Sequence, residues 1–168
     1  MQFPRMLARL ILVAVLTAAG AGPALAQVDQ PPGGQVFPNP APLGPGVPRE
    51  DLLEVMIKAA LMTFNDANLT GNYAVLSARL HPEFRQQAPA DRLATIFEGF
   101  RTNKINIAPA LAHKAVFTEA PSLDAMGLLV AKGQMETRPW RTTFDLNWRR
   151  EGDQWLLWKV NVRVVPTQ

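Results

Sequence analysis

The segment FDLNWRREGDQWLLWKV, which begins at Phe144, constrains the fold most strongly. Phe144, Leu146 and Trp148 alternate with polar residues, which is the period of a β-strand with one buried face. Residues 151–153 indicate a turn, and residues 155–165 return as a long strand rich in β-branched side chains. A hairpin with one apolar face must be covered, so other parts of the chain have to supply the covering layer.

Helices are expected in the first half of the domain and strands in the second. Acidic residues in a first turn, followed by apolar residues at helical spacing, predict a first helix that turn formers end at residues 68–72. The predicted helices cover residues 49–65, 72–80 and 91–103. Two further strands are predicted over residues 112–118 and 127–137, with the segment EAPSLDAM between them.

The first 26 residues have the order of a secretory signal peptide. Arg5 and Arg9 precede an apolar run over residues 10–21, and residues 24–26 form a small-x-small cleavage site. The run is short for a bilayer span, so we expect cleavage after Ala26 and no stable membrane anchor afterwards. The chain is therefore expected in the periplasm or as a secreted protein.

Residues 27–48 are predicted to be a disordered linker. They hold seven prolines and four glycines in 22 positions, which removes amide donors and backbone restraint together. One interpretation is a spacer; another, because Pro38, Pro40 and Pro42 recur at alternate positions, is a ligand for a partner domain. The folded domain is then residues 49–168.

The composition excludes several classes of function. The chain has no cysteine, which excludes disulfides, thiolate metal sites, cysteine nucleophiles and a lipidated cysteine. The pI of about 9.7 owes much to Arg5 and Arg9, because without them 15 basic residues face 14 acidic ones. These charges are interspersed, so neither a nucleic acid nor an anionic membrane surface is expected as a partner.

Helices followed by an antiparallel meander predict an α+β fold, with three helices packed on one face of a curved sheet of about four strands. This order resembles the nuclear transport factor 2-like family, also called the SnoaL-like or cystatin-like α+β cone. The motifs that carry the resemblance lie within residues 49–165, and they are FNDANLTGNYAVL, LHPEFR and WRREGDQWLLWKV. The resemblance implies an exported bacterial member with an apolar cone cavity, in a family that includes isomerases, dehydratases, transport adaptors and association modules.

The same resemblance directs attention to three side chains. Enzymes of the family place a carboxylate or a histidine in the mouth of the cone, often with a tyrosine hydroxyl that holds the oxyanion. Asp145, His81 and Tyr73 are the catalytic candidates on that ground, although no spacing demonstrates an acid–base dyad. His81 and His113 are the only histidines and no suitably spaced ligand accompanies them, so no metal site is expected.

Each catalytic candidate also has a structural interpretation. His81 precedes a proline at a helix end, where an imidazole can cap the last carbonyls. Asp145 is either a base on the concave face or a surface charge on the convex face, paired with an arginine at position 141, 149 or 163.

The large aromatic residues allow two interpretations, either core packing or a pocket or interface. They are Trp148, Trp155, Trp158, Phe97 and Phe100. Trp155 and Trp158 are three residues apart and are expected on opposite faces of the last strand.

From these observations we expect an exported, non-catalytic binding or association module whose apolar cavity takes a small apolar ligand or a protein partner, without a cofactor. One alternative is a cofactor-free isomerase or dehydratase that uses an acid–base residue in the cone. Another is a structural homodimer whose interface is the outer face of the sheet, with Val162, Val164 and one tryptophan.

Overall fold

A computed structural model describes residues 46–138 and 140–167, and these residues form an α+β fold. The predicted signal peptide and nearly all of the predicted linker lie outside the described residues. The helices are α1 (Glu50–Thr70), α2 (Ala74–Arg79), α3 (Pro82–Gln87), α4 (Ala90–Ile96), α5 (Glu98–Thr102) and the 3-10 helix η1 (Ala108–Ala112). The strands are β1 (Val116–Phe117), β2 (Ser122–Leu123), β3 (Leu129–Met135), β4 (Trp140–Glu151) and β5 (Gln154–Pro166).

The first helix continues past residue 65, where it was predicted to end, and reaches into the turn formers of residues 68–72. Asn68 is satisfied inside the helix, because its amide donates to the carbonyl of Phe64 at 2.8 Å and its carbonyl accepts from the hydroxyl of Tyr73. The end falls instead at Gly71, whose φ of 74° is the left-handed conformation that glycine adopts without steric cost. The predicted end at residue 65 was therefore wrong, because Asn68 belongs to the helix and only Gly71 among the turn formers ends it.

The segment after α2 contains more helices than predicted. Pro82 occupies the first turn of α3, where its missing N–H is not needed, and so it begins a helix rather than ending one. The third predicted helix is divided into α4 and α5 at Phe97, whose backbone leaves the helical conformation. Three helices were expected before the strands; the described chain has five α-helices there.

The strands form one antiparallel sheet in the order β1-β3-β4-β5, and β2 also pairs with β3. The predicted hairpin is confirmed as β4 and β5, with Phe144 opposite Val162 and a register shift between Asn147 and Trp148. β2 lies in the segment that was expected to be a loop. The sheet thus has five strands, where about four were predicted.

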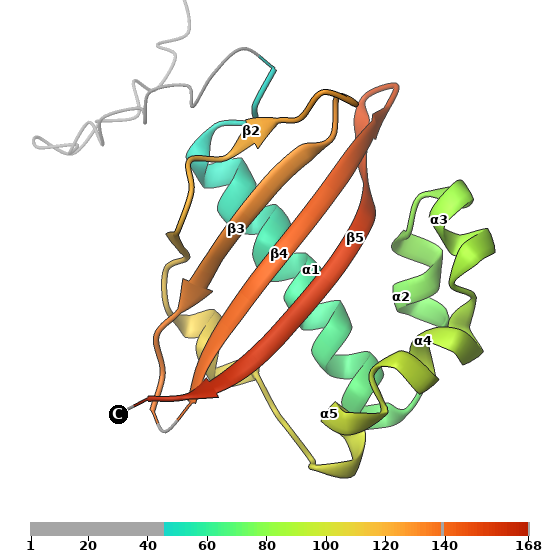
Figure 1. Ribbon diagram of the computed structural model, residues 1–168, viewed down its shortest axis with the longest axis vertical. Helices are drawn as coiled ribbons and strands as arrows, with labels where there is room; N and C mark the ends of the chain where they lie inside the picture. Colours follow the sequence, from blue (N-terminus) through green and yellow to red (C-terminus); the bar gives the residue numbers. More distant parts are fainter. Residues whose placement is uncertain (1–45, 139, 168) are drawn as a thin grey trace, which may run out of the picture. The chain divides into compact units, whose positions relative to one another are not determined.

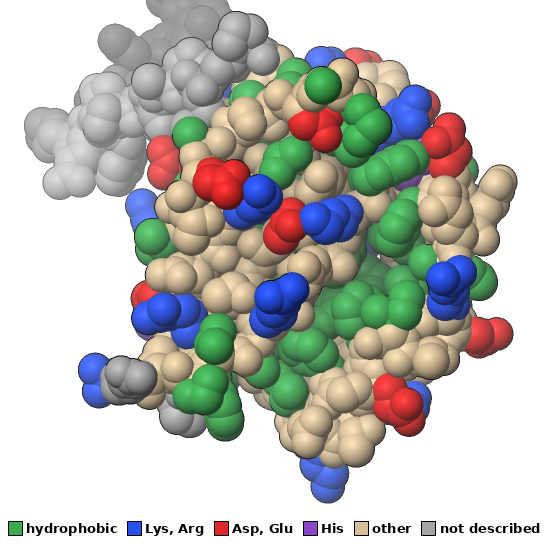
Figure 2. Space-filling view, viewed as in Figure 1, with side chains coloured by type: hydrophobic (Ala, Val, Ile, Leu, Met, Phe, Trp, Pro, Cys, Tyr) green, Lys and Arg blue, Asp and Glu red, His purple; other side chains and the backbone are tan. Residues whose placement is uncertain are grey.

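Among the described residues, helices cover one face of the sheet, and α1 runs across it (Figure 1). Along β4 every second residue is buried, and the buried set joins the core with the fully enclosed α1 residues Leu53, Ile57, Leu61 and Phe64. The helices α2–α5 stand beside the β5 edge, where the amide of His81 donates to the carbonyl of Leu157 at 2.8 Å (Figure 1). Figure 2 shows the uncovered face with basic and acidic side chains interspersed, and a hollow with apolar side chains beside the α2–α5 helices.

Candidate functional site

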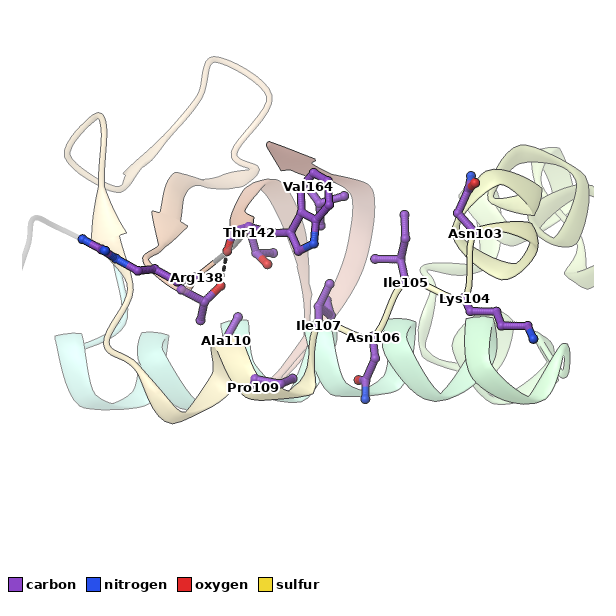
Figure 3. A pocket seen from close by; sticks show the side chains of 12 residues that line it. Asn103, Lys104, Ile105, Asn106, Ile107, Pro109, Ala110, Arg138, Thr142 and Val164 are labelled. Atoms are coloured by element: carbon purple, nitrogen blue, oxygen red, sulfur yellow. Dashed lines mark hydrogen bonds between the residues drawn. The ribbon is translucent and has the colours of Figure 1, made fainter. Parts of the chain in front are cut away.

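A cavity lies at the end of the sheet where β3 passes into β4, and we call it the end pocket (Figure 3). Its volume is about 570 Å³, within the range of about 300–1,000 Å³ that is usual for small-molecule sites. It is lined by Asn103, Lys104, Ile105, Asn106, Ile107, Pro109, Ala110, Thr137, Arg138, Trp140, Thr142 and Val164. Segments far apart in the sequence therefore build one concave surface.

The wall of the end pocket is mainly apolar. Ile107 and Ala110 are buried behind it, and Ile105 and Val164 pack against the same core. Trp140 is half exposed, at 51 % of its surface, in spite of its large indole ring. An exposed aromatic ring on a cavity wall offers apolar surface to a ligand and one N–H for a polar contact.

Thr142 places a hydroxyl group in the end pocket. The residue is 2 % exposed, and no hydrogen bond joins its side chain to any residue within the described ranges. The hydroxyl is not sealed in the core either, because every fully enclosed polar side-chain atom of the described chain has a partner. Figure 3 shows Thr142 opposite Ala110 and Ile107 across the cavity, so its hydroxyl can bond a water or a ligand there.

Asn65 holds the segment that closes the end pocket. Its side chain is buried on α1, and its carbonyl accepts from the amide of Ile107 at 2.9 Å. The two residues are 42 positions apart, so this bond ties α1 to the segment between α5 and η1. Asn65 was not among the predicted site residues; its only signal was a polar residue on the apolar side of a helix.

The charged side chains that line the end pocket are basic. Lys104 and Arg138 are exposed, and neither forms an ion pair with another residue of the described chain. Figure 3 shows them at opposite ends of the pocket with their charged groups directed outward. The described lining contains no carboxylate, so the site favours a neutral or anionic ligand over a cation.

A second depression, which we call the rim depression, adjoins the end pocket and shares Pro109, Thr137 and Arg138 with it. Its other lining residues are His113, Glu136, Arg141 and Thr167. Glu136 accepts from the guanidinium of Arg141 and from the amide of Gln134. The acidic residue of this surface is therefore already engaged, while Arg138 lies between the two depressions.

Asp145 lies on the uncovered face of the sheet. Its carboxylate forms an ion pair with the ammonium group of Lys159 at 2.5 Å. The partner was expected to be an arginine; it is a lysine, because the register places Lys159 opposite Asn147, diagonal to Asp145 on the same face. Asp145 does not line the end pocket.

His81 is buried at the start of α3 and connects that helix to the β4–β5 hairpin. Its Nδ1 accepts from the amide of Glu83 at 3.3 Å, so Nε2 donates to the carboxylate of Glu151 at 2.8 Å in the neutral ring. The imidazole therefore caps the beginning of α3, and the expectation that it caps the last carbonyls of a helix was wrong. It also contacts the ring of Trp158, with 4.9 Å between centroids.

Tyr73 is a core residue. Its hydroxyl donates to the carbonyl of Asn68, and its ring stacks on Phe97 at 6.4 Å. Burial raises the pKa of Tyr73 above its ordinary value, and the charge of Arg101 opposes this in part. Within the described ranges no hydrogen bond or ion pair joins any two of Tyr73, His81 and Asp145, so the candidates do not assemble into an acid–base dyad.

The aromatic residues singled out by the sequence do not line the end pocket. Phe97 and Phe100 pack edge-on against Phe64, with centroid distances of 4.9 and 5.0 Å. Trp148 and Trp155 line a smaller depression against α1.

Trp158 lies elsewhere, with its ring tilted by 53° against that of His81 and under the guanidinium of Arg149, which is 5.3 Å from the ring centroid. The tryptophan of the end pocket is Trp140, which lies outside the hairpin segment that drew attention to the other three.

In the part of the chain that the structure describes, no group of three or more histidine or acidic residues could hold a metal ion. No helix there has the length and apolarity needed to cross a membrane. No family model matches the chain, and neither a curated protein nor a solved structure is significantly similar to it.

Proposed function

We propose that this protein is an exported, non-catalytic binding module of the nuclear transport factor 2-like type, which holds a small amphipathic molecule in the end pocket. The observation that carries the proposal is a cavity of about 570 Å³ with an apolar wall, an exposed indole ring and one buried hydroxyl without a partner among the described residues. Apolar walls with a few polar groups are typical of small-molecule sites.

The remaining parts of the proposal come from the sequence. The signal peptide is removed after Ala26, and residues 27–48 hold the domain away from its N-terminus while it acts in the periplasm or outside the cell. Helices on a single face of an antiparallel sheet agree with the cone expected for this family.

The catalytic alternative has less support, because its three candidate side chains are each bonded to a different partner. Asp145 is paired with Lys159, Tyr73 with Asn68, and His81 with Glu151. A general base must lie within hydrogen-bond reach of the proton that it removes, in a site that also admits the substrate.

The homodimer alternative has less support, because the two valines that suggested it do not lie on the outer face of the sheet. Val162 is buried opposite Phe144, and Val164 lies opposite Thr142 in the lining of the end pocket. Both valines thus belong to the covered side of the sheet, so the expectation that they form an outer interface was wrong.

Native mass spectrometry tests the proposal on the protein purified without denaturation from the cells that produce it. We expect a monomer that carries a retained small-molecule adduct, and we expect Trp140→Ala to lose most of the adduct. Met126→Ala is the matched control, because Met126 is 75 % exposed and lies outside the end pocket. An adduct that Trp140→Ala retains in full, or a bare monomer, would contradict the proposal; a bare dimer would favour the association module.

A further inference from the structure

We infer that the end pocket takes an amphipathic anion, with its head group at Arg138 and its apolar part against Trp140. The inference rests on the proposed function and narrows it to one class of ligand, an apolar chain or ring system that ends in a carboxylate or a group of similar charge. It follows from the position of Arg138, which lines both depressions, and from the apolar wall beside it.

Elsewhere on the uncovered face, two lysines are paired with acidic side chains of the protein. Lys132 contacts Glu119 at 3.1 Å, and Lys159 contacts Asp145 at 2.5 Å. Such pairs leave little net charge for a ligand to recognise.

Arg138 differs from these two lysines because it forms no ion pair within the described chain, although the acidic residue Glu136 is only two positions away. Both carboxylate oxygens of Glu136 are engaged, one at 2.7 Å from the amide nitrogen of Gln134 and the other at 3.0 Å from the Nε atom of Arg141. Arg141 is thereby neutralised, and Arg138 has no counter-ion among the described residues that line either depression. An uncompensated cation at the junction of two cavities attracts an anion.

The chemistry of the two sides favours a ligand with two different ends. The guanidinium group of Arg138 presents parallel N–H donors that match a carboxylate in a bidentate contact. On the other side lie the indole of Trp140 and the aliphatic side chains of Ile105 and Val164. A purely apolar ligand would leave the guanidinium unused, and a small polar anion would leave the apolar wall exposed to water.

Calorimetric titration with three probes of equal chain length tests this inference. The probes are dodecanoate, dodecanol and dodecyltrimethylammonium, each below the concentration at which it forms micelles. We expect the protein to bind dodecanoate about tenfold more tightly than dodecanol at low ionic strength, and the difference to shrink at high salt.

Three substitutions test which residues produce the preference and the binding. Arg138→Gln is expected to abolish the preference, so that dodecanoate and dodecanol bind with equal affinity. Arg163→Gln, which removes an exposed arginine of β5 outside both depressions, is the matched control and should retain the preference. Trp140→Ala should weaken the binding of every probe that binds the protein.

The outcomes separate the two proposals. Equal affinity for dodecanoate and dodecanol, weakened for both by Trp140→Ala, would overturn the anion inference and leave the binding function standing. Preference for dodecyltrimethylammonium, or a preference for dodecanoate that survives Arg138→Gln, would also overturn it. Failure of all three probes to bind would count against the binding function itself.

Discussion

At the scale of single residues, the polar side chains buried on α1 hold the domain together at defined points. Thr63 donates to the carbonyl of Ala59, Asn68 to that of Phe64, and Asn65 accepts from Ile107. A buried polar group without a hydrogen-bond partner lowers the free energy of unfolding by about 1–3 kcal/mol. Each of these bonds therefore favours the chain arrangement in which its partner is present. Tyr73 takes part in the same arrangement through Asn68.

Tyr73 is the only tyrosine of the chain, so its ionisation can be followed directly by the absorbance of the tyrosinate group. Burial raises the pKa of Tyr73 in the folded state, which means that the unfolded chain loses this proton first as the pH rises. The contribution to stability is therefore complete below a pH of about 10 and is lost as the pH rises through the folded-state pKa. We expect the absorbance transition to lie above that of a tyrosine model peptide; a transition at the model value in the folded protein would contradict burial of the hydroxyl.

Substitution of two tryptophans distinguishes a core residue from a residue of the end pocket. Trp148 is 3 % exposed, and we expect Trp148→Ala to lower the free energy of unfolding by about 3–5 kcal/mol in urea titrations. Trp140→Ala removes the same type of side chain from an exposed position on the end pocket. It should lower the free energy of unfolding by much less than Trp148→Ala does. Similar losses for the two variants would show that Trp140 is as much a part of the core as Trp148.

At the scale of elements, the close approach of β1 to β3 depends on a glycine. A Cβ atom on Gly133 would lie 2.6 Å from the carbonyl oxygen of Val116 and 2.8 Å from the Cζ atom of Phe144. The first of these atoms belongs to the backbone, so it can move only if β1 moves. The short strand β1 therefore pairs with β3 at this position because residue 133 has no side chain.

We expect Gly133→Ala to destabilise the domain by about 1–3 kcal/mol, measured by thermal or urea unfolding, because the added methyl group overpacks the sheet. Gly99→Ala is the matched control, since a Cβ at Gly99 meets no atom within 4 Å. Alanine favours the helix over glycine by up to about 1 kcal/mol, so the control should be neutral or stabilising. Equal effects at the two positions would rule out steric contact as the cause.

At the scale of the whole molecule, the two faces of the sheet have different chemistry. The covered face is apolar and packs on α1, whereas Glu119, Lys132, Asp145 and Lys159 form a row of alternating charges across the other face. The contact with Glu119 raises the pKa of Lys132, with a smaller contribution from Asp145. Exposed ion pairs contribute little to stability, so this row mainly keeps the face hydrated.

We therefore expect the purified protein to remain a monomer up to high micromolar concentration in sedimentation experiments. A charged face lacks the apolar centre that stable dimer interfaces usually have. A mass that rises with concentration, and that returns to the monomer value in Lys159→Glu, would show that this face associates after all.

The parts of the fold that the sequence predicts are those set by local periodicity. The alternation from Phe144 onward predicts the β4–β5 hairpin, because burial of one face of a strand repeats every second residue. The apolar spacing after residue 49 likewise predicts most of α1. The end of that helix was misplaced, because the role of Asn68 depends on Tyr73 folding back onto it.

The candidate site could not be predicted in the same way. The end pocket joins Ile107 and Arg138 to Val164, and no period in the sequence connects these positions. The bond from Asn65 to Ile107 spans 42 residues, and the pairing of Asp145 with Lys159 depends on the register of two strands.

The sequence by itself therefore determined the fold class and the hairpin, since these follow from interactions between near neighbours along the chain. Only the tertiary structure decided which side chains face the cavity and which charges remain without a partner, because both depend on contacts between distant segments.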